Sequence, residues 1–261
     1  MAHTALITGA STGIGYALSR CFAADHHNLV LVARQEQRLH QVADELHREF
    51  GVTAKALVAD LSRPDAPQMI LDTVRKESLH VEYLVNNAGI GLGGKFAETD
   101  IMVELGMMQI NMTALVHLTK LFLPDMVARR SGRIMNVSST AAFQPGPLMA
   151  VYFATKSFVL SFSEAIANEL GGTGVTVTAL CPGPTESEFQ KRARIENTRL
   201  VKGKLMGLMT SEAVAKIGYA GFMSGKRLVI PGLLNKIGVQ STRMAPRAVA
   251  TQITRMLQEN H

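Results

Sequence analysis

The amino-acid sequence predicts a single α/β domain, a doubly wound parallel sheet of about seven strands with helices on both faces. Two observations predict this fold. Short β-rich runs alternate with helix-periodic segments along most of the 261 residues, which is typical of βαβ units. A glycine-rich turn joins the first run to the first helix. Because the sequence shows no internal repeat and no interdomain linker, we expect one domain over residues 1–261.

Composition excludes several classes of protein. With 47% hydrophobic and 18% charged residues, the chain is neither disordered nor fibrous. Its apolar stretch at residues 115–123 is interrupted by His117 and Lys120 and is too short to span a bilayer. The first residues lack the basic segment of a secretory signal, and Cys21 and Cys181 have no metal-binding spacing. We therefore expect a cytoplasmic protein with no metal site and no nucleic-acid partner.

The first predicted strand, residues 4–8, leads into a glycine-rich turn. Gly9, Gly13 and Gly15 stand in this turn, and an apolar-periodic helix continues to about residue 24. Glycine lets backbone N–H groups approach a pyrophosphate, and the helix N-terminus adds partial positive charge. A merely structural turn is the alternative. The strand before the turn and the helix after it favour dinucleotide binding in a Rossmann-like fold.

The second strand, residues 28–33, ends at Arg34, roughly 20 residues beyond the glycines. A carboxylate at this place binds the ribose 2′-hydroxyl of NAD. An arginine cannot accept that hydrogen bond but can clamp a 2′-phosphate. Two alternatives remain, because Arg34 could simply open the helix of residues 35–50 and Glu36 lies close enough to serve NAD. Arg34 therefore favours NADP(H) over NAD(H).

Alternating elements continue through the middle of the chain, and two strands end in polar or glycine-containing segments. These elements are a strand at 52–58 followed by Asp60 and Leu61, a helix at about 64–78, and a strand at 82–85 followed by Asn86, Asn87, Ala88 and Gly89. Repeated units of this kind imply a parallel sheet with right-handed crossovers.

Asn111 interrupts a long apolar-periodic segment at residues 103–122. Asparagine competes for backbone hydrogen bonds inside a helix and tends to bend it. A bend could expose a carbonyl group to bound water. An ordinary surface asparagine is the alternative.

Ser139 follows a short strand at residues 134–137, at the sheet edge where α/β proteins place ligands. Tyr152 and Lys156 are four residues apart, so they share one face if Tyr152 opens a helix. A nearby ammonium group stabilises a phenolate and moves the tyrosine pKa towards the working range of a proton shuttle. Ser139 could hold a substrate oxygen beside Tyr152. For the Tyr-Lys spacing alone, a solvated helix face is the alternative.

The remaining third of the chain gives weaker patterns. The helix after Tyr152 is expected to end near residue 170, and a strand at 175–180 leads into a proline-containing loop. Residues 186–225 are interpreted as a substrate-binding loop or lid, although their apolar group could merely fill space. This group consists of Leu205, Met206, Leu208 and Met209. A seventh strand at 228–230 and a last helix at 246–257 complete the pattern.

The tail, residues 233–261, is basic. Residues 1–212 hold 20 basic and 20 acidic side chains, whereas residues 213–260 hold seven basic and one acidic, so the net charge of +6 comes from the last fifth of the chain. In the last helix, an apolar face is predicted opposite Arg243, Arg247 and Arg255, and consists of Val249, Ile253, Met256 and Leu257. Such a helix suits weak peripheral contact with an anionic membrane, packing on its own core or a second subunit, or attraction of a phosphate-bearing substrate.

Together these motifs resemble the short-chain dehydrogenase/reductase family over nearly the whole chain. The likeness is carried, in order and at similar spacings, by Thr8, Gly9, Gly13, Gly15, Asp60, Asn86, Asn87, Ala88, Gly89, Asn111, Ser139, Tyr152, Lys156, Pro182 and Gly183. The ending looks similar to NADP-linked ketoacyl-type and ketosteroid-type reductases, some of which associate with membranes. Thr12 departs from the pattern, because NADP-preferring members often have a basic residue there.

The resemblance implies roles for individual residues. Tyr152 would be the proton donor, and Ser139 would position the carbonyl group. Lys156 would lower the tyrosine pKa and hold the nicotinamide ribose, and Asn111 would support a water relay. The implied cofactor contacts are Gly9, Ser11, Thr12, Gly13, Ile14, Gly15, Arg34, Asp60, Leu61, Asn87, Ala88, Gly89, Tyr152, Lys156, Pro182, Gly183, Thr185 and Ser187.

The sequence therefore predicts an NADP(H)-dependent oxidoreductase that reduces a ketone, or oxidises a secondary alcohol, of a small and mainly apolar substrate. The resemblance also implies a homo-oligomer, either a dimer or a tetramer. An NAD(H)-dependent enzyme of the same family is one alternative. A redox-inert dinucleotide-binding scaffold is another, although such a protein need not retain Ser139, Tyr152 and Lys156 together.

Overall fold

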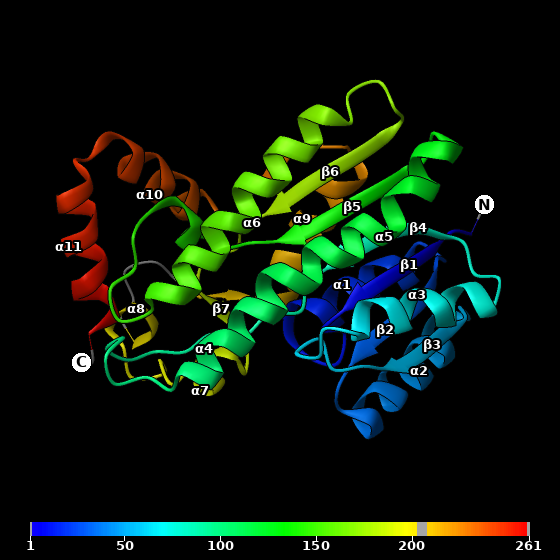
Figure 1. Cartoon of the computed structure of the whole chain (residues 1–261), viewed down its shortest axis with the longest axis horizontal. Coiled ribbons are helices and arrows are strands. Elements are labelled where there is room, and N and C mark those ends of the chain that lie inside the picture. Colours follow the sequence, from blue (N-terminus) through cyan, green and yellow to red (C-terminus); the bar gives the residue numbers. More distant parts are fainter. Residues whose placement is uncertain (1, 203–207, 260–261) are drawn as a thin grey trace.

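A computed structural model describes residues 2–202 and 208–259 of the chain. Within these residues, seven parallel strands form a central sheet in the order β3-β2-β1-β4-β5-β6-β9 (Figure 1). The strands are β1 (Thr4–Thr8), β2 (Asn28–Ala33), β3 (Ala54–Val58), β4 (Val81–Asn86), β5 (Gly132–Val137), β6 (Val175–Leu180) and β9 (Leu228–Val229). The order reverses direction at β1, so the predicted doubly wound α/β fold is confirmed.

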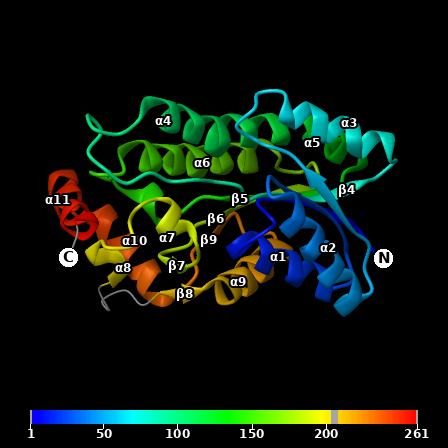
Figure 2. The same cartoon turned by 90° about the horizontal axis from the view of Figure 1, so that it is seen from below.

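Helices cover both faces of the sheet (Figure 2). The helices of one layer are α1 (Gly13–Ala24), α2 (Glu36–Phe50) and α9 (Ser211–Met223). Those of the other layer are α3 (Ala66–Lys76), α4 (Ile101–Met108), α5 (Ala114–Arg129) and α6 (Ala150–Glu169). Strands buried on both faces need no polar side. Accordingly, β2 is a nearly continuous apolar run in which every residue after Asn28 is buried.

The helix α9 belongs to the core, although the predicted lid, residues 186–225, included it. It packs beside α1, and Phe222 is fully buried between α9 and the sheet. The ring of Phe222 meets those of Phe22 and Tyr83 edge to face, at centroid distances of 5.9 and 5.8 Å. This aromatic contact fixes α9 to the sheet. Residues 203–207 of the predicted lid, including Leu205 and Met206, lie outside the described residues.

A π-helical turn, η1 (Gln109–Thr113), joins α4 and α5 into one continuous helix and contains Asn111. The predicted irregularity at this asparagine is therefore present. By length and composition, the 29-residue helix Ile101–Arg129 contains an 18-residue window of mean hydropathy 1.3 and could cross a membrane, which was not expected from the sequence. Its second half nevertheless buries Leu118, Phe122 and Met126 against the sheet, as the core helix of a globular domain does.

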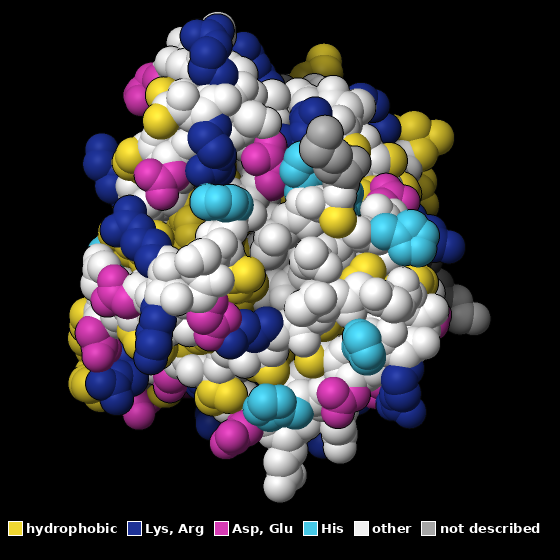
Figure 3. All heavy atoms as spheres, turned by 90° about the vertical axis from the view of Figure 1, so that its right-hand side faces the viewer, with side chains coloured by type: hydrophobic (Ala, Val, Ile, Leu, Met, Phe, Trp, Pro, Cys, Tyr) yellow, Lys and Arg dark blue, Asp and Glu magenta, His cyan; other side chains and the backbone are white. Residues whose placement is uncertain are grey.

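The remaining elements gather where the strands end (Figure 1). They are the 3₁₀ turn η2 (Thr140–Phe143), a small parallel sheet of β7 (Thr185–Glu186) and β8 (Met209–Thr210), and the helices α7 (Phe189–Arg192), α8 (Arg199–Lys202), α10 (Leu233–Met244) and α11 (Arg247–Gln258). The helix α10 was not predicted from the sequence. The opposite end of the molecule, where the strands begin, shows basic and acidic side chains side by side (Figure 3).

The last helix buries a different face from the predicted one. Its buried residues are Ala250, Thr254 and Gln258. Val249, Ile253 and Met256 of the predicted apolar stripe are 44–48% exposed. The helix α11 packs against α8, and the Arg199 N–H donates to the Glu259 carbonyl at 3.0 Å. The helix therefore packs on the protein through another face than the predicted stripe, and contact of the stripe with a membrane or a second subunit stays a prediction.

We expect Phe222→Ala to lower the free energy of unfolding by about 3–5 kcal/mol, because it removes a fully buried ring and leaves a cavity between α9 and the sheet. Chemical denaturation measures this loss. Phe96→Ala is the matched control, since Phe96 is 64% exposed and its truncation should cost less than about 0.5 kcal/mol. Equal losses in the two variants would contradict the role given to Phe222.

Candidate active site

One cavity of about 1340 Å³ lies at the carboxyl ends of the strands. Every residue predicted to bind cofactor lines it, from Gly9 in the first turn to Ser187 after β6. Ser139, Tyr152 and Lys156 line it too. The carboxyl ends of parallel strands meet at one sheet edge, so residues far apart in sequence come together there. Of the predicted site residues, Asn111 alone is not part of the wall.

The glycine turn forms a cradle that side chains would fill. Gly9 and Gly13 have φ values of 66° and 58°, which favour glycine. A Cβ on Gly15 would overlap the Gly9 carbonyl oxygen and the Asn87 amide. The helix α1 begins at Gly13, so its free N–H groups and dipole face this part of the cavity. The cradle fits the pyrophosphate of a dinucleotide.

A side-chain lock holds this turn to the segment after β4. The Thr8 hydroxyl oxygen accepts hydrogen bonds from the backbone N–H groups of Asn87 and Ala88, both at 3.0 Å. In return, the Asn87 amide donates to the Thr8 and Gly9 carbonyls at 2.8 and 3.2 Å. The sequence indicated Thr8 only through the family resemblance, because its hydrogen-bond partners lie about 80 residues away along the chain and leave no local pattern.

The ends of β2 and β3 place Arg34 and Asp60 along the wall beyond the glycine turn. Burial raises the pKa of Asp60, but hydrogen bonds from Ser62 and the nearby charges of Arg34 and Arg63 outweigh it and lower the pKa. The Ser62 N–H donates to the Asp60 carboxylate at 3.0 Å. Arg34 is exposed at the cavity edge, so its guanidinium group is accessible to a phosphate.

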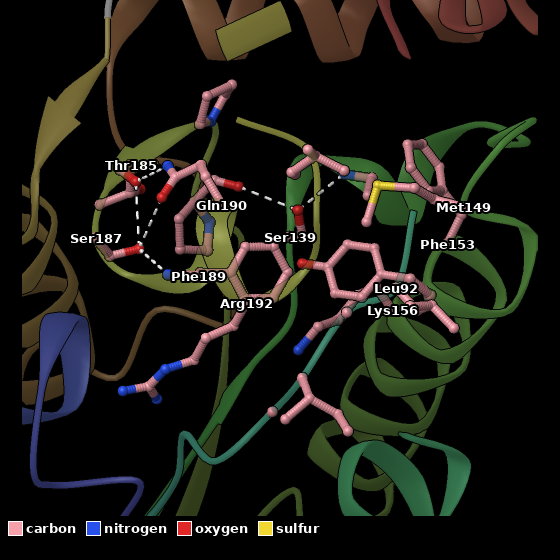
Figure 4. A pocket seen from close by; sticks show the side chains of 18 of the residues that line it. Leu92, Ser139, Met149, Phe153, Lys156, Thr185, Ser187, Phe189, Gln190 and Arg192 are labelled. Carbon is pink, nitrogen blue, oxygen red and sulfur yellow. Dashed lines mark hydrogen bonds between the residues drawn. The ribbon is translucent and has the colours of Figure 1, made fainter. Parts of the chain in front are cut away.

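Three side chains predicted to be catalytic lie at one point of the cavity. Ser139 caps η2, where its oxygen accepts from the Ala141 N–H at 3.1 Å and its hydroxyl donates to the Pro182 carbonyl at 3.4 Å (Figure 4). Tyr152 lies in the first turn of α6, and Lys156 follows one turn later. The Lys156 Nζ lies 5.7 Å from the centroid of the Tyr152 ring and donates to the Val137 carbonyl at 3.0 Å.

Burial is the main cause of the pKa shifts of Tyr152 and Lys156. It raises the pKa of Tyr152 to about 12, against the opposing effect of a hydrogen bond with Ser139. Burial also lowers the pKa of Lys156 to about 8. The expected lowering of the tyrosine pKa by Lys156 is therefore not seen, since the ammonium group is directed to the Val137 carbonyl and desolvation is the larger effect. With this raised pKa, Tyr152 holds its proton at neutral pH, which its predicted role as proton donor requires.

Asn111 lies behind the cavity wall and is 1% exposed. Its side chain accepts from the Ile90 N–H at 3.0 Å and donates to the Ile90 carbonyl at 2.9 Å and to the Thr155 hydroxyl at 3.0 Å. These bonds tie the segment after β4 to α6, the helix that carries Tyr152. The structure gives Asn111 a supporting role, and its part in a water relay stays a prediction.

The substrate side of the cavity contains residues that were not named from the sequence, although Phe189 lies in the predicted substrate-binding segment, residues 186–225. Phe189 of α7 faces Tyr152 at a ring-centroid distance of 5.3 Å. Leu92, Met149 and Phe153 extend the apolar wall around it (Figure 4). Phe153 belongs to the long helix α6, whereas Leu92, Met149 and Phe189 come from loops or a short helix without a periodic pattern, so only their apolar character could have signalled them.

The helices α10 and α11 form the roof of the cavity. Asn235 of α10 is 3% exposed, and its amide donates to the Pro231 carbonyl at 2.8 Å. A Cβ on Gly183 would overlap this amide, so α10 rests directly on the loop after β6. The roof therefore contacts both the predicted cofactor loop and the substrate side.

A parallel α/β fold with a glycine cradle beside a serine, tyrosine and lysine defines a dinucleotide-binding site. Comparison identifies the family. The model of the short chain dehydrogenases matches residues 3–198, so the chain belongs to this oxidoreductase family and the predicted resemblance is confirmed.

Individual relatives agree with this assignment. A short chain dehydrogenase of Pseudocercospora fijiensis is 38% identical over 188 residues, which cover 71% of this chain and 60% of that protein. A ketoacyl reductase of Nostoc is 31% identical over 212 residues, covering 81% of this chain and 72% of that one. A short-chain dehydrogenase from Sphingobium yanoikuyae, solved with NADPH, is 34% identical, has a TM-score of 0.83 and matches 93% of both chains.

We expect Gly15→Ala to lower the free energy of unfolding by about 1–3 kcal/mol even without ligand, because the added methyl group overlaps backbone atoms that cannot give way. Gly106→Ala is the control within α4, since a Cβ there meets nothing within 4 Å and alanine favours a helix. Denaturation of the two variants compares these effects. A Gly15→Ala protein as stable as Gly106→Ala would contradict the tight cradle.

Proposed function

We propose that this protein is an NADP(H)-dependent oxidoreductase that interconverts a ketone and a secondary alcohol on a mainly apolar substrate. The observation that carries the proposal is the meeting of Ser139, Tyr152 and Lys156 in the same cavity as the glycine cradle. A site with these three groups has a hydrogen-bond donor for a carbonyl oxygen, a proton source and a cation beside it.

When bound, the nicotinamide supplies the hydride. The residues of the chain would bind the carbonyl group and supply the proton. The Ser139 hydroxyl and the protonated Tyr152 hold the carbonyl oxygen, and Tyr152 gives it a proton as negative charge develops there. The Lys156 ammonium group stabilises the phenolate that remains, at a distance of one helical turn.

Two observations support NADP(H) over NAD(H). Arg34 stands at the end of β2, where a carboxylate would bind the NAD ribose, and its charge suits a 2′-phosphate. The 34% identical dehydrogenase from Sphingobium yanoikuyae was solved with NADPH. Asp60 and Leu61 line the wall next to Arg34, where the adenine end would lie.

The lining supports an apolar substrate. The residues around Tyr152 form one hydrophobic cluster with Phe189 and Val201, and its buried members are Ala141, Met149, Phe153, Ala193 and Ile195. Burial among these apolar side chains also removes water from Tyr152 and so raises its pKa. A ketone carried on an apolar framework would keep water away from the reacting carbonyl.

We expect Tyr152→Phe to lower kcat for ketone reduction by about 10²- to 10⁴-fold, because it removes the transferable proton. NADPH binding, followed by thermal shift, should be nearly unchanged. Tyr219→Phe is the control, since Tyr219 hydrogen-bonds Asp25 on the α1 side of the sheet. The wild type is first assayed with NADPH and a panel of ketones. Retention of more than about a tenth of kcat in Tyr152→Phe would contradict its role as proton donor.

We expect Arg34→Asp to weaken NADPH binding by about 2–4 kcal/mol, because it replaces a charge-assisted contact with repulsion. NADH affinity should hold or improve. Arg48→Asp makes the same change of charge at the far end of α2 and should leave both affinities within about twofold. If the ratio of NADPH to NADH affinity stayed the same in Arg34→Asp, Arg34 would not read the 2′-phosphate.

A further inference from the structure

Two buried amides in the roof of the cavity have carbonyl oxygens without a hydrogen-bond partner among the described residues. They are Oδ1 of Asn235 and Oε1 of Gln258, in side chains that are 3% and 5% exposed. An unpaired buried acceptor costs about 1–3 kcal/mol, so each one calls for an explanation. Both residues line the cavity.

The two amides differ in what holds them. The Asn235 amide donates to the Pro231 carbonyl at 2.8 Å and packs on Gly183, so it already joins α10 to the loop after β6. The Gln258 side chain makes no hydrogen bond within the part of the chain that the structure describes. Its neighbour on the same helix face, Thr254, satisfies its own hydroxyl with the Ala250 carbonyl at 2.9 Å. Of the two roof amides, Gln258 is therefore the one that joins no other element of the described structure through a hydrogen bond.

An apolar path leads from the reacting group to this amide. Tyr152, Phe189 and Val201 belong to one hydrophobic cluster, and Val201 is part of α8, against which α11 packs. On α11, the apolar side chains of Ile253 and Leu257 line the same cavity as Gln258. A ligand whose carbonyl lies at Tyr152 would thus cross apolar side chains before it meets Gln258.

We propose that Gln258 binds a hydroxyl group of the substrate, carried at a distance from the reacting carbonyl; this rests on the proposed function. The unpaired atom is a carbonyl oxygen, so the ligand group must donate a hydrogen bond. A hydroxyl also accepts one, and can therefore satisfy both ends of the amide. The substrate class is an apolar ketone with a remote hydroxyl group.

Charge selects a neutral donor over an ammonium group. Among the described residues, α8, α10 and α11 contribute no charged side chain to the cavity. An ammonium group at Gln258 would lose its hydration and find no counter-ion on these three helices, which is far more costly than burying a hydroxyl. The amide and the hydroxyl form instead an ordinary pair of neutral hydrogen bonds.

The test compares two series of straight-chain methyl ketones with NADPH, one plain and one carrying a terminal hydroxyl, in steps of one carbon. The proteins are wild type, Gln258→Leu and Gln252→Leu. The control makes the same substitution at an exposed position of α11. Thermal unfolding without ligand is measured alongside, because leucine in place of an unpaired amide should not lower the melting temperature.

We expect wild type and Gln252→Leu to prefer the hydroxylated ketone, by about tenfold in kcat/KM, over a narrow range of chain lengths. Gln258→Leu should lose that preference and keep its kcat/KM for plain ketones. Reduction of plain ketones without a preference at any chain length would overturn this inference and leave the proposed function standing. A preference that persists in Gln258→Leu would overturn it equally. If no ketone were reduced, the proposed function would fall and the inference with it.

Discussion

The site depends on the hydrogen bonds that tie the end of β1 to the end of β4. Neighbouring parallel strands leave backbone groups unpaired where their ladder stops, and buried groups of this kind need partners. Thr8 and Asn87 supply them, through four bonds of 2.8–3.2 Å. Because side-chain bonds from Thr8 and Asn87 hold the glycine turn, the backbone N–H groups of the turn remain free to face the cavity. The glycines allow a ligand to approach this backbone closely, and the four hydrogen bonds fix the position of the turn.

A second set of buried hydrogen bonds joins β5 to α6, the helix that contains Tyr152 and Lys156. The Ser138 hydroxyl donates to the Lys156 carbonyl at 2.8 Å, and Lys156 donates to the Val137 carbonyl at 3.0 Å, so β5 and α6 are joined across the layer. Deeper in the layer, the Asn136 amide donates to the Ser163 hydroxyl at 2.9 Å. Satisfied networks of this kind rigidify a core. The ammonium group is thus part of the structure that positions Tyr152.

Local signals explain what could be predicted from the sequence. The strands β2 and β6 have the predicted bounds, because β2 is a continuous apolar run after Asn28 and β6 is rich in β-branched valine and threonine. Residues of the glycine turn, of the Ser139 turn and of α6 meet in one cavity because they follow strands of one parallel sheet. Helix α10 escaped prediction because its outward apolar residues Leu233 and Ile237, 72% and 57% exposed, blur its periodicity.

Properties that depend on tertiary surroundings could not be predicted. The spacing of Tyr152 and Lys156 showed that a cation lies near a phenol, but the sequence does not show how much water the fold removes from both. Desolvation decides the direction of their pKa shifts. The partners of Asn111, which are Ile90 and Thr155, likewise follow from packing alone. Each of these is a statement about burial, whereas sequence motifs report only residue type and distance along the chain.

The part of the chain that matches the family and the part that lies beyond the match form different walls of the cavity. The match to the family covers residues 3–198, which hold the cradle and the three predicted catalytic side chains, whereas α10 and α11 come after it. These helices form the roof, and their unpaired amides each cost about 1–3 kcal/mol in the free protein. A domain with about 5–15 kcal/mol of stability can retain such groups, and binding sites are where they are expected. Since Asn235 rests on Gly183, the roof is also joined to the predicted cofactor loop, so the part of the cavity that we propose to select the substrate is positioned by the part that would hold the nicotinamide.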